Sequence, residues 1–213
     1  MIKSERIAKN ISEHIKTWRK GHGKLVVAID GYAGSGKTTI GDFLAAQNSD
    51  VLSVHLDDFI KHWRVRKRMI GGARDKSREF EYRWYRYDDI EKLVKAFKGK
   101  DRGLISLKTY DYDKNDYGPK WSFDLSKKVL VIDGIFLLHP KGELHKYLDK
   151  TVYLNAAFSK ADKKRVAREK KKWGKGYLPE DHPDNWTRYF KQAYGRYVEK
   201  YNPEDRADLV FDV

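Results

Sequence analysis

Short apolar runs alternate with segments of helical periodicity along most of the 213-residue chain. Runs of apolar and β-branched residues predict strands at residues 25–30, 51–56, 129–133, 151–154 and 207–213. Apolar positions at helical spacing predict helices at residues 1–20, 40–47, 89–97, 159–172 and 186–201. Because strands alternate with helices, the pattern favours an α/β fold with a parallel sheet flanked by helices.

Two stretches interrupt this alternation. Residues 60–87 are basic and aromatic without a clear period, which predicts a loop-rich insertion after the second strand. Residues 104–112 read as a strand or a hairpin arm, and residues 113–124 are polar, with a turn expected at Gly118-Pro119. We therefore expect one domain, 1–213, that carries these two insertions, at about 60–88 and 104–124.

A glycine-rich segment follows the first predicted strand. Residues 31–39 read Gly-Tyr-Ala-Gly-Ser-Gly-Lys-Thr-Thr and lead into the next predicted helix. Glycines let backbone N–H groups converge on phosphate oxygens, a lysine neutralises the outer phosphates, and a hydroxyl can bind Mg²⁺. The sequence thus predicts a binding site for a nucleoside triphosphate such as ATP, formed by Gly31, Ala33, Gly34, Ser35, Gly36, Lys37, Thr38 and Thr39.

Composition narrows the class of protein. The chain has no cysteine, which excludes disulfides and thiolate metal sites, and its net charge of +14 would favour any polyanion, ATP and nucleic acid included. Residues 1–20 read as an amphipathic helix and not as a signal peptide, and no stretch is long and apolar enough to span a bilayer. We expect a soluble, cytoplasmic protein that has no membrane partner.

Two acidic residues follow predicted strands. Because ligands of open α/β sheets bind beyond the carboxyl ends of the strands, Asp57 and Asp133 are expected beside the glycine-rich loop. Asp133 is expected to hold Mg²⁺ together with Thr38, and Asp57 is expected to act as general base toward an acceptor hydroxyl. The alternatives are a structural acid at position 133 and a helix cap at Asp57 or Asp58.

The order of these segments resembles the uridine kinase and phosphoribulokinase-like family of P-loop kinases. The resemblance rests on residues 31–39, 55–59 (His-Leu-Asp-Asp-Phe), 109–112 (Thr-Tyr-Asp-Tyr), 129–136, 165–169 (Arg-x-x-Arg-Glu), Pro203 and 207–210. It implies a P-loop fold, a kinase activity, and a lid helix in a lid region at about 159–176. It also implies that the two insertions lie on the acceptor side.

The resemblance assigns individual residues. It implies that Asp57 is the base, that Tyr110 and Asp111 lie at a nucleoside pocket, and that Arg165 and Arg168 are lid arginines that act with Lys37. Asp133 stands where the family commonly has Glu, and Ile60 and Tyr82 depart from the pattern of uridine-phosphorylating members. The aromatic residues at 80–87 are expected either to form a wall of the acceptor site or to pack the insertion. The residues expected to contact the acceptor are Asp57, Phe59, Tyr82, Tyr85, Tyr110 and Asp111.

The leading hypothesis is an ATP- and Mg²⁺-dependent kinase that transfers the γ-phosphate to a hydroxyl of a nucleoside or other sugar-like small molecule. The alternatives are a nucleotide-dependent nucleic-acid-binding protein and a polynucleotide 5′-hydroxyl kinase, because basic and aromatic residues are interleaved. Solvated helix faces also explain most of the lysines, so nucleic acid is the weaker partner hypothesis. The acceptor, the preference for ATP over GTP, the regulation and the oligomeric state stay open.

Overall fold

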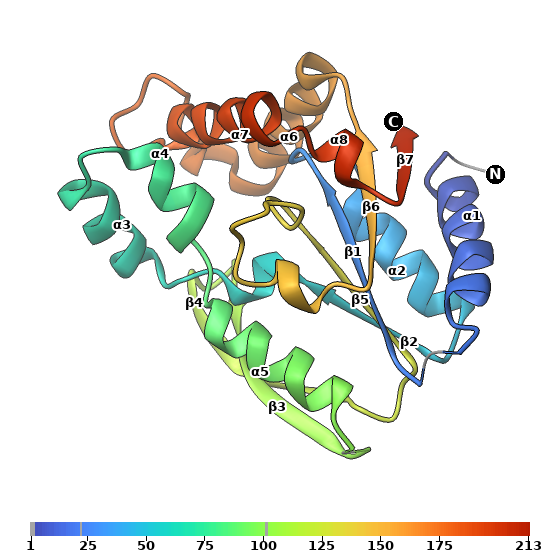
Figure 1. Ribbon diagram of the computed structural model, residues 1–213. Helices are drawn as coiled ribbons and strands as arrows, with labels where there is room; N and C mark the ends of the chain where they lie inside the picture. Colours follow the sequence, from blue (N-terminus) through green and yellow to red (C-terminus); the bar gives the residue numbers. More distant parts are fainter. Residues whose placement is uncertain (1–2, 22, 101) are drawn as a thin grey trace.

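The computed structural model describes residues 3–21, 23–100 and 102–213 (Figure 1). The strands are β1 (Leu25–Gly31), β2 (Val51–His55), β3 (Leu104–Asp111), β4 (Asp116–Asp124), β5 (Val129–Gly134), β6 (Lys150–Asn155) and β7 (Leu209–Asp212). The α-helices are α1 (Lys3–Trp18), α2 (Lys37–Gln47), α3 (Trp63–Gly72), α4 (Lys76–Arg78), α5 (Tyr87–Lys98), α6 (Phe158–Trp173), α7 (Thr187–Tyr201) and α8 (Pro203–Arg206). The shorter turns are η1 (Leu56–Phe59), η3 (His145–Tyr147) and η4 (Gly174–Gly176), which are 3₁₀-helical, and η2 (Glu79–Arg83), which is π-helical.

A parallel sheet with strand order β2-β5-β1-β6-β7 forms the centre of the molecule. This confirms the α/β prediction. The register places Asp133 of β5 between Ile29 of β1 and His55 of β2, so the carboxyl ends of three strands meet at one edge. In a parallel sheet the chain leaves every strand at the same edge. The loops that follow β1, β2 and β5 therefore come together there.

The two faces of the sheet carry separate apolar clusters, because side chains alternate along a strand. Leu25, Val27 and Ile29 of β1 pack against α1 and α2. Val26 and Ala28 belong to the cluster that also holds apolar residues of α5 and α7. Figure 1 shows this layering, with α1 and α2 on one side of the sheet and α5 and α7 on the other.

The N-terminal helix packs on the domain as its periodicity predicts. Ile7, Ala8, Ile11 and Ile15 of α1 are buried, and α1 lies against α2. Each buried isoleucine contributes about 1.5–3 kcal/mol by leaving water. Among residues 3–21, 23–100 and 102–213, no helix is long and apolar enough to cross a membrane.

The prediction of a loop-rich segment at 60–87 was wrong. This segment contains α3, α4 and η2, and an isolated antiparallel bridge joins Ile60 to Tyr85 at its ends. The helices are short and of two kinds, α and π, so their apolar positions follow no common period. A polar residue of this segment, Arg66, also packs against aromatic residues: its guanidinium lies over the rings of Trp84 and Tyr110.

The turn predicted at Gly118-Pro119 was also misplaced. Both residues lie within β4, which pairs antiparallel with β3 in a separate two-stranded sheet. The turn instead precedes β4: Asn115 has a φ of 53°, and the Asp111 carboxylate accepts hydrogen bonds from the backbone N–H groups of Asp113 and Lys114. The hairpin tolerates Pro119 because a two-stranded sheet offers edge positions where no ladder bond is required.

Candidate active site

A cavity of about 600 Å³ lies beyond the carboxyl ends of β1, β2 and β5. It is bounded by the glycine-rich loop, by the turn after β2, by the segment 80–85 and by α6 and α7. Its lining comprises Ala33, Gly34, Gly36, Lys37, Thr38, Thr39, His55, Asp57, Asp58, Ile60, Phe80, Trp84, Tyr85, Tyr112, Asp133, Gly134, Ile135, Phe136, Arg165, Arg168, Glu169, Lys172, Trp173 and Phe190.

The glycine-rich loop has the backbone geometry of a phosphate cradle. Gly34 and Gly36 have φ values of 87° and 97°, in the left-handed region that side chains avoid. A Cβ at Gly34 would also lie 2.5 Å from the carbonyl oxygen of Ala161 in α6. Gly36 immediately precedes α2, so the loop presents a helix N-terminus to the cavity, where anions are favoured.

Polar groups of this loop fit a phosphate ligand. The Nζ of Lys37 donates to the carbonyl oxygens of Gly31 and Tyr32 at 2.7 and 2.9 Å. The Oγ of Ser35 is buried and has no hydrogen-bond partner within the described part of the chain. Burial lowers the pKa of Lys37, and nearby Asp133, Asp30 and Asp57 oppose this shift. A bound phosphate would supply the missing acceptor and a stronger counter-charge.

Thr38 and Asp133, the two predicted metal residues, lie next to each other. The Thr38 hydroxyl donates to Oδ1 of Asp133 at 3.0 Å, and Asp133 is almost fully buried. His55 Nδ1 binds the other carboxylate oxygen, and its Nε2 lies 3.3 Å from the Asp42 carboxylate. The hydrogen bond with Asp133 raises the pKa of His55 to about 9, although burial opposes the rise.

This donor set fits a magnesium ion that binds through a nucleotide. Within the described residues, no group of three or more His, Cys, Asp or Glu side chains could hold a metal ion alone. Mg²⁺ usually takes one or two protein oxygens and completes its shell with phosphates and water. One hydroxyl at the end of the glycine-rich loop and one carboxylate near the end of β5 meet that requirement.

Asp57 lies in the same cavity, in the η1 turn that directly follows β2. It is exposed to solvent, and its Oδ1 accepts a hydrogen bond from the Tyr85 hydroxyl at 3.0 Å. The Tyr112 hydroxyl donates to its backbone oxygen at 3.3 Å. Tyr85 comes from the end of the 60–87 segment and Tyr112 from the hairpin loop, so both insertions reach Asp57.

The two predicted lid arginines differ in their surroundings. Arg165 is buried and donates to the carboxylates of Asp162, Glu169 and Glu180 at 2.7 to 2.9 Å. Arg168 is exposed, lines the cavity, and forms no ion pair within the described ranges. Arg165 therefore ties α6 to the segment after it, and Arg168 presents an uncompensated cation to the cavity.

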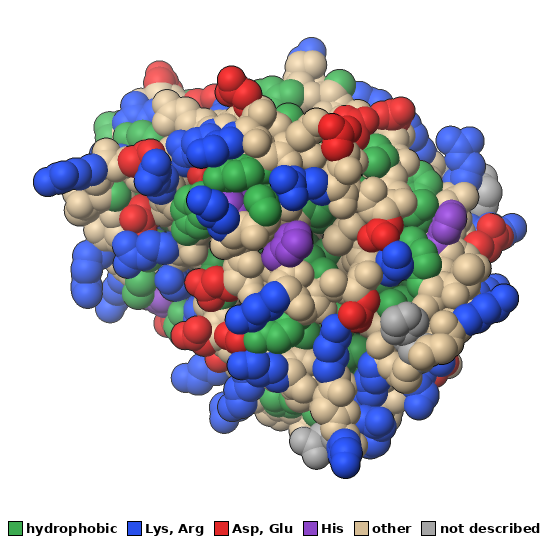
Figure 2. Space-filling model, in the orientation of Figure 1, with side chains coloured by type: hydrophobic (Ala, Val, Ile, Leu, Met, Phe, Trp, Pro, Cys, Tyr) green, Lys and Arg blue, Asp and Glu red, His purple; other side chains and the backbone are tan. Residues whose placement is uncertain are grey.

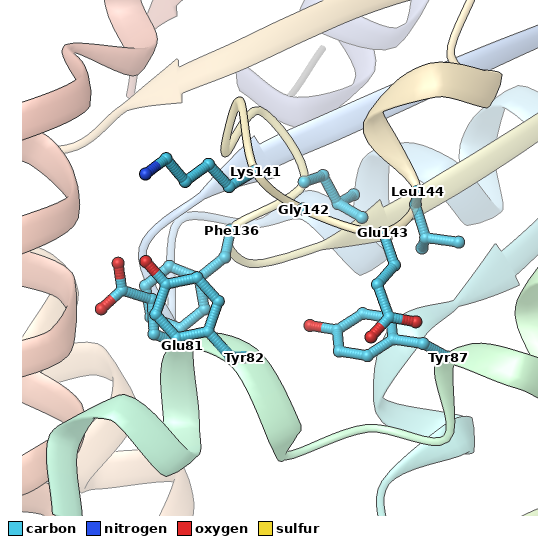
Figure 3. A pocket seen from close by; sticks show the side chains of 9 residues that line it. Glu81, Tyr82, Tyr87, Phe136, Lys141, Gly142, Glu143 and Leu144 are labelled. Atoms are coloured by element: carbon cyan, nitrogen blue, oxygen red, sulfur yellow. The ribbon is translucent and has the colours of Figure 1, made fainter. Parts of the chain in front are cut away.

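Only part of the predicted acceptor set lies at the cavity. Tyr85 does; Phe59 is wholly buried beneath it, and Tyr110 is buried in the hairpin with its hydroxyl on Asn115. Asp111 caps the hairpin turn. Tyr82 points to the opposite side, into a small second pocket where Figure 3 shows it beside Glu81 and Phe136. These positions correct the expectation that the six residues share one site.

Aromatic residues outside the predicted acceptor set form the wall opposite the loop; Phe80 and Trp84 belong to the 80–87 stretch that was predicted to form a wall or to pack, and Phe190 was not singled out. The rings of Phe80 and Trp84 stack at 3.8 Å, and Phe190 of α7 lies 6.1 Å from Phe80 and 5.4 Å from Tyr32. Lys172 and Trp173 at the end of α6 close the cavity rim. The aromatic enrichment at 80–87 was the available signal; which rings turn inward could not be inferred from it.

We expect a pH-dependent stability effect at Asp58. Burial raises the pKa of Asp58 to about 6; His55 opposes the rise, and Asp57 and Asp133 add to it. The unfolded chain loses this proton near pH 4, so stability falls as pH rises from about 4 to 6. Asp58→Asn should raise the free energy of unfolding by about 1–2 kcal/mol at pH 7.5 and leave it unchanged at pH 4.

Urea unfolding at both pH values measures this effect, with exposed Asp113→Asn as the control. An equal change at pH 4 and pH 7.5 would show that the ionised form of Asp58 carries no folding cost.

Comparison with known proteins agrees with this architecture. A search of curated protein sequences finds no match. A possible uridine kinase from Bacillus stearothermophilus has a similar structure, with a TM-score of 0.69 and 23% identity, over 96% of this chain and 97% of that one. D-glycerate 3-kinase from Cryptococcus neoformans has a TM-score of 0.69 and 13% identity, over 97% and 95%.

Phosphoribulokinase from Rhodobacter spheroides has a TM-score of 0.60 and 12% identity, over 89% of this chain and 70% of that one. At these identities the likenesses establish the fold. The sequence model of the phosphoribulokinase/uridine kinase family matches residues 26–213, nearly the whole chain. The chain is therefore a P-loop kinase that belongs to the phosphoribulokinase/uridine kinase family.

Proposed function

We propose that the protein transfers the γ-phosphate of ATP to a hydroxyl of a small molecule, a nucleoside or another sugar-like alcohol. The observation that carries this proposal is the convergence on one cavity of Lys37, Thr38 and Asp133 on one side and the exposed Asp57 on the other. A protein that only binds the nucleotide has no need for such a carboxylate, which can accept the proton of an acceptor hydroxyl.

Different residues of the chain have separate roles in the proposed phosphoryl transfer. Backbone N–H groups of the glycine-rich loop and Lys37 bind the phosphates, and Thr38 and Asp133 would hold Mg²⁺, which supplies positive charge beside them. Asp57 accepts the proton of the acceptor hydroxyl, and Tyr85 orients it through the 3.0 Å hydrogen bond. Arg168 stabilises negative charge on the phosphoryl group in transit.

The acceptor half of the cavity is mostly aromatic. Phe80, Trp84 and Tyr85 face the volume next to Asp57, and Phe190 extends this wall toward the glycine-rich loop. Such a wall supports binding of a ring through stacking, which suits a nucleoside base or the apolar face of a sugar. Asp57 then makes the polar contact with the reacting hydroxyl.

An acceptor screen tests the proposal. ADP release from MgATP is measured with uridine, other nucleosides, D-glycerate, D-fructose and ribulose 5-phosphate, each against a reaction without acceptor. A 5′-hydroxyl oligonucleotide belongs in the panel because the net charge is +14 and Lys and Arg side chains are scattered over the face in Figure 2, among acidic ones. Turnover of a small alcohol supports the proposal; turnover of the oligonucleotide alone would overturn it.

Arg168 offers a test of the lid. Arg168→Gln should lower kcat by about 100-fold and change the dissociation constant of ATP little, because its charge acts near the transition state. Lys163→Gln, an exposed charge of the same helix outside the cavity, is the matched control and should be silent. Equal kcat values for Arg168→Gln and the wild type would remove Arg168 from the mechanism.

A further inference from the structure

The two faces of the π-helical turn η2 line two different cavities. Phe80, together with Trp84 just after the turn, lines the large cavity. Glu81 and Tyr82 line the small pocket of about 70 Å³ on the other side, and Figure 3 shows both rising from the same segment beside Phe136. A π-turn is rare and strained relative to an α-helix, so something must hold it in place.

Glu81 is the point at which the turn is held. Its side chain is only 1% exposed. Its Oε2 accepts hydrogen bonds from Nε and Nη2 of Arg196 in α7, at 2.8 and 2.5 Å. Its Oε1 lies 3.0 Å from Nε2 of His139, in the loop after β5. Two segments that are distant in sequence therefore bind one carboxylate.

The hydrogen bonds of His139 identify which of its ring nitrogens carries a proton. Its Nδ1 accepts a hydrogen bond from the backbone N–H of Lys141, so Nε2 carries the proton and donates to Glu81. Burial raises the pKa of Glu81, but the hydrogen bonds from His139 and Arg196 outweigh this and hold the pKa below its usual range. The carboxylate is charged and its oxygens are engaged, which makes Glu81 a structural anchor.

The same two segments also anchor the donor side. Tyr197, next to Arg196 in α7, donates to Oδ2 of Asp30 at 2.6 Å, directly before the glycine-rich loop. The backbone N–H of Leu138, next to His139, donates to the same oxygen at 2.9 Å. Arg196 with His139 holds the aromatic wall, and Tyr197 with Leu138 holds the phosphate loop, so the separation of the two halves is set by one helix and one loop.

We propose that Glu81 is a positioning residue that fixes the aromatic wall of Phe80, Trp84 and Tyr85 relative to Asp57. The inference rests on the proposed function only in calling this wall the acceptor wall. Glu81 touches neither the large cavity nor the glycine-rich loop, so its influence passes through η2. A polar anchor suits this role because hydrogen-bond geometry specifies one arrangement, whereas an apolar contact accepts several.

Hydrogen–deuterium exchange tests the anchor without knowledge of the acceptor. Glu81→Gln places an amide N–H₂ against the donors of Arg196 or His139, and amides at 79–86 should exchange about tenfold faster. Peptides from 31–47 should keep wild-type exchange. The control is Glu91→Gln in α5, which alters a carboxylate bonded to Lys95 and Tyr147, remote from the cavity. Unchanged exchange at 79–86, or an equal increase everywhere, would overturn the proposal.

A second variant separates positioning from stability. Glu81→Leu combined with Arg196→Met replaces the ion pair by apolar side chains, and the Tyr82 hydroxyl, 3.2 Å from Nε2 of His139, stays as an acceptor for that nitrogen. This variant should therefore preserve the melting temperature better than Glu81→Gln. It should still show faster exchange at 79–86, and wild-type exchange there would overturn the proposal. With any acceptor that the wild type turns over, both variants should raise the acceptor KM and leave the ATP KM unchanged. A wild type that turns over no acceptor would count against the proposed function, and the exchange result would stand.

Discussion

Replacement of Asp57 by Asn is expected to lower the rate of phosphoryl transfer by about 10²–10⁴-fold, the usual contribution of a general base. Asn keeps the size and can still accept the hydrogen bond from Tyr85, but it cannot take a proton. Affinity for ATP should stay within about twofold of wild type, because the proposed role of Asp57 is toward the acceptor hydroxyl and not toward the phosphates.

Steady-state turnover and calorimetric titration with ATP measure the two quantities separately. Asp124→Asn is a suitable control, because this carboxylate caps a turn at the base of the hairpin and lies outside the cavity. Turnover of Asp57→Asn at the wild-type rate would rule out Asp57 as the base. Tyr85→Phe adds a graded test: it should lower turnover less than Asp57→Asn, because it frees the base without removing it.

Replacement of Lys37 by Ala is expected to weaken ATP binding by about 100-fold, or about 3 kcal/mol, the value of one or two charge-assisted hydrogen bonds. Lys37 belongs to the glycine-rich loop, and its Nζ already donates to the carbonyl oxygens of Gly31 and Tyr32. Without it, the carboxylates of Asp57 and Asp133, which line the cavity, are left without this positive charge, which further disfavours a triphosphate.

Calorimetry with ATP and with AMP checks this expectation. The loss should be large for ATP and small for AMP, because Lys37 acts on the outer phosphates. Lys163→Gln again serves as the control for removal of a positive charge. Equal losses for both nucleotides would indicate a collapsed loop, and unchanged ATP affinity would contradict the phosphate-binding role of Lys37.

The donor side was readable in the sequence because its parts are local. The phosphate loop is one contiguous motif whose glycines and lysine act on the same ligand, and the strand before it is strongly apolar. Asp57 and Asp133 are distant in sequence, but each follows a predicted strand, and the rule for parallel sheets brings strand ends together. The structure places both beside the loop.

The acceptor side was not readable in the same way. Tyr82 and Tyr85 are three positions apart in one aromatic stretch, and they face different cavities because a π-turn lies before Tyr85. Asp111 could have faced a ligand, and instead it caps the hairpin turn. Partners such as Arg196 and His139 lie far from Glu81 in sequence, so no spacing rule connects them.

The amino-acid sequence is sufficient for the strands of the parallel sheet, the phosphate loop and the acids at the strand ends, because each depends on neighbours along the chain or on one general rule of topology. The direction of each aromatic side chain, the contact of Arg165 with Glu180 and the anchorage of Glu81 depend on contacts between different segments. Those contacts form only when α6, α7 and the two insertions pack around the sheet, and they shape the half of the cavity that we propose binds the acceptor.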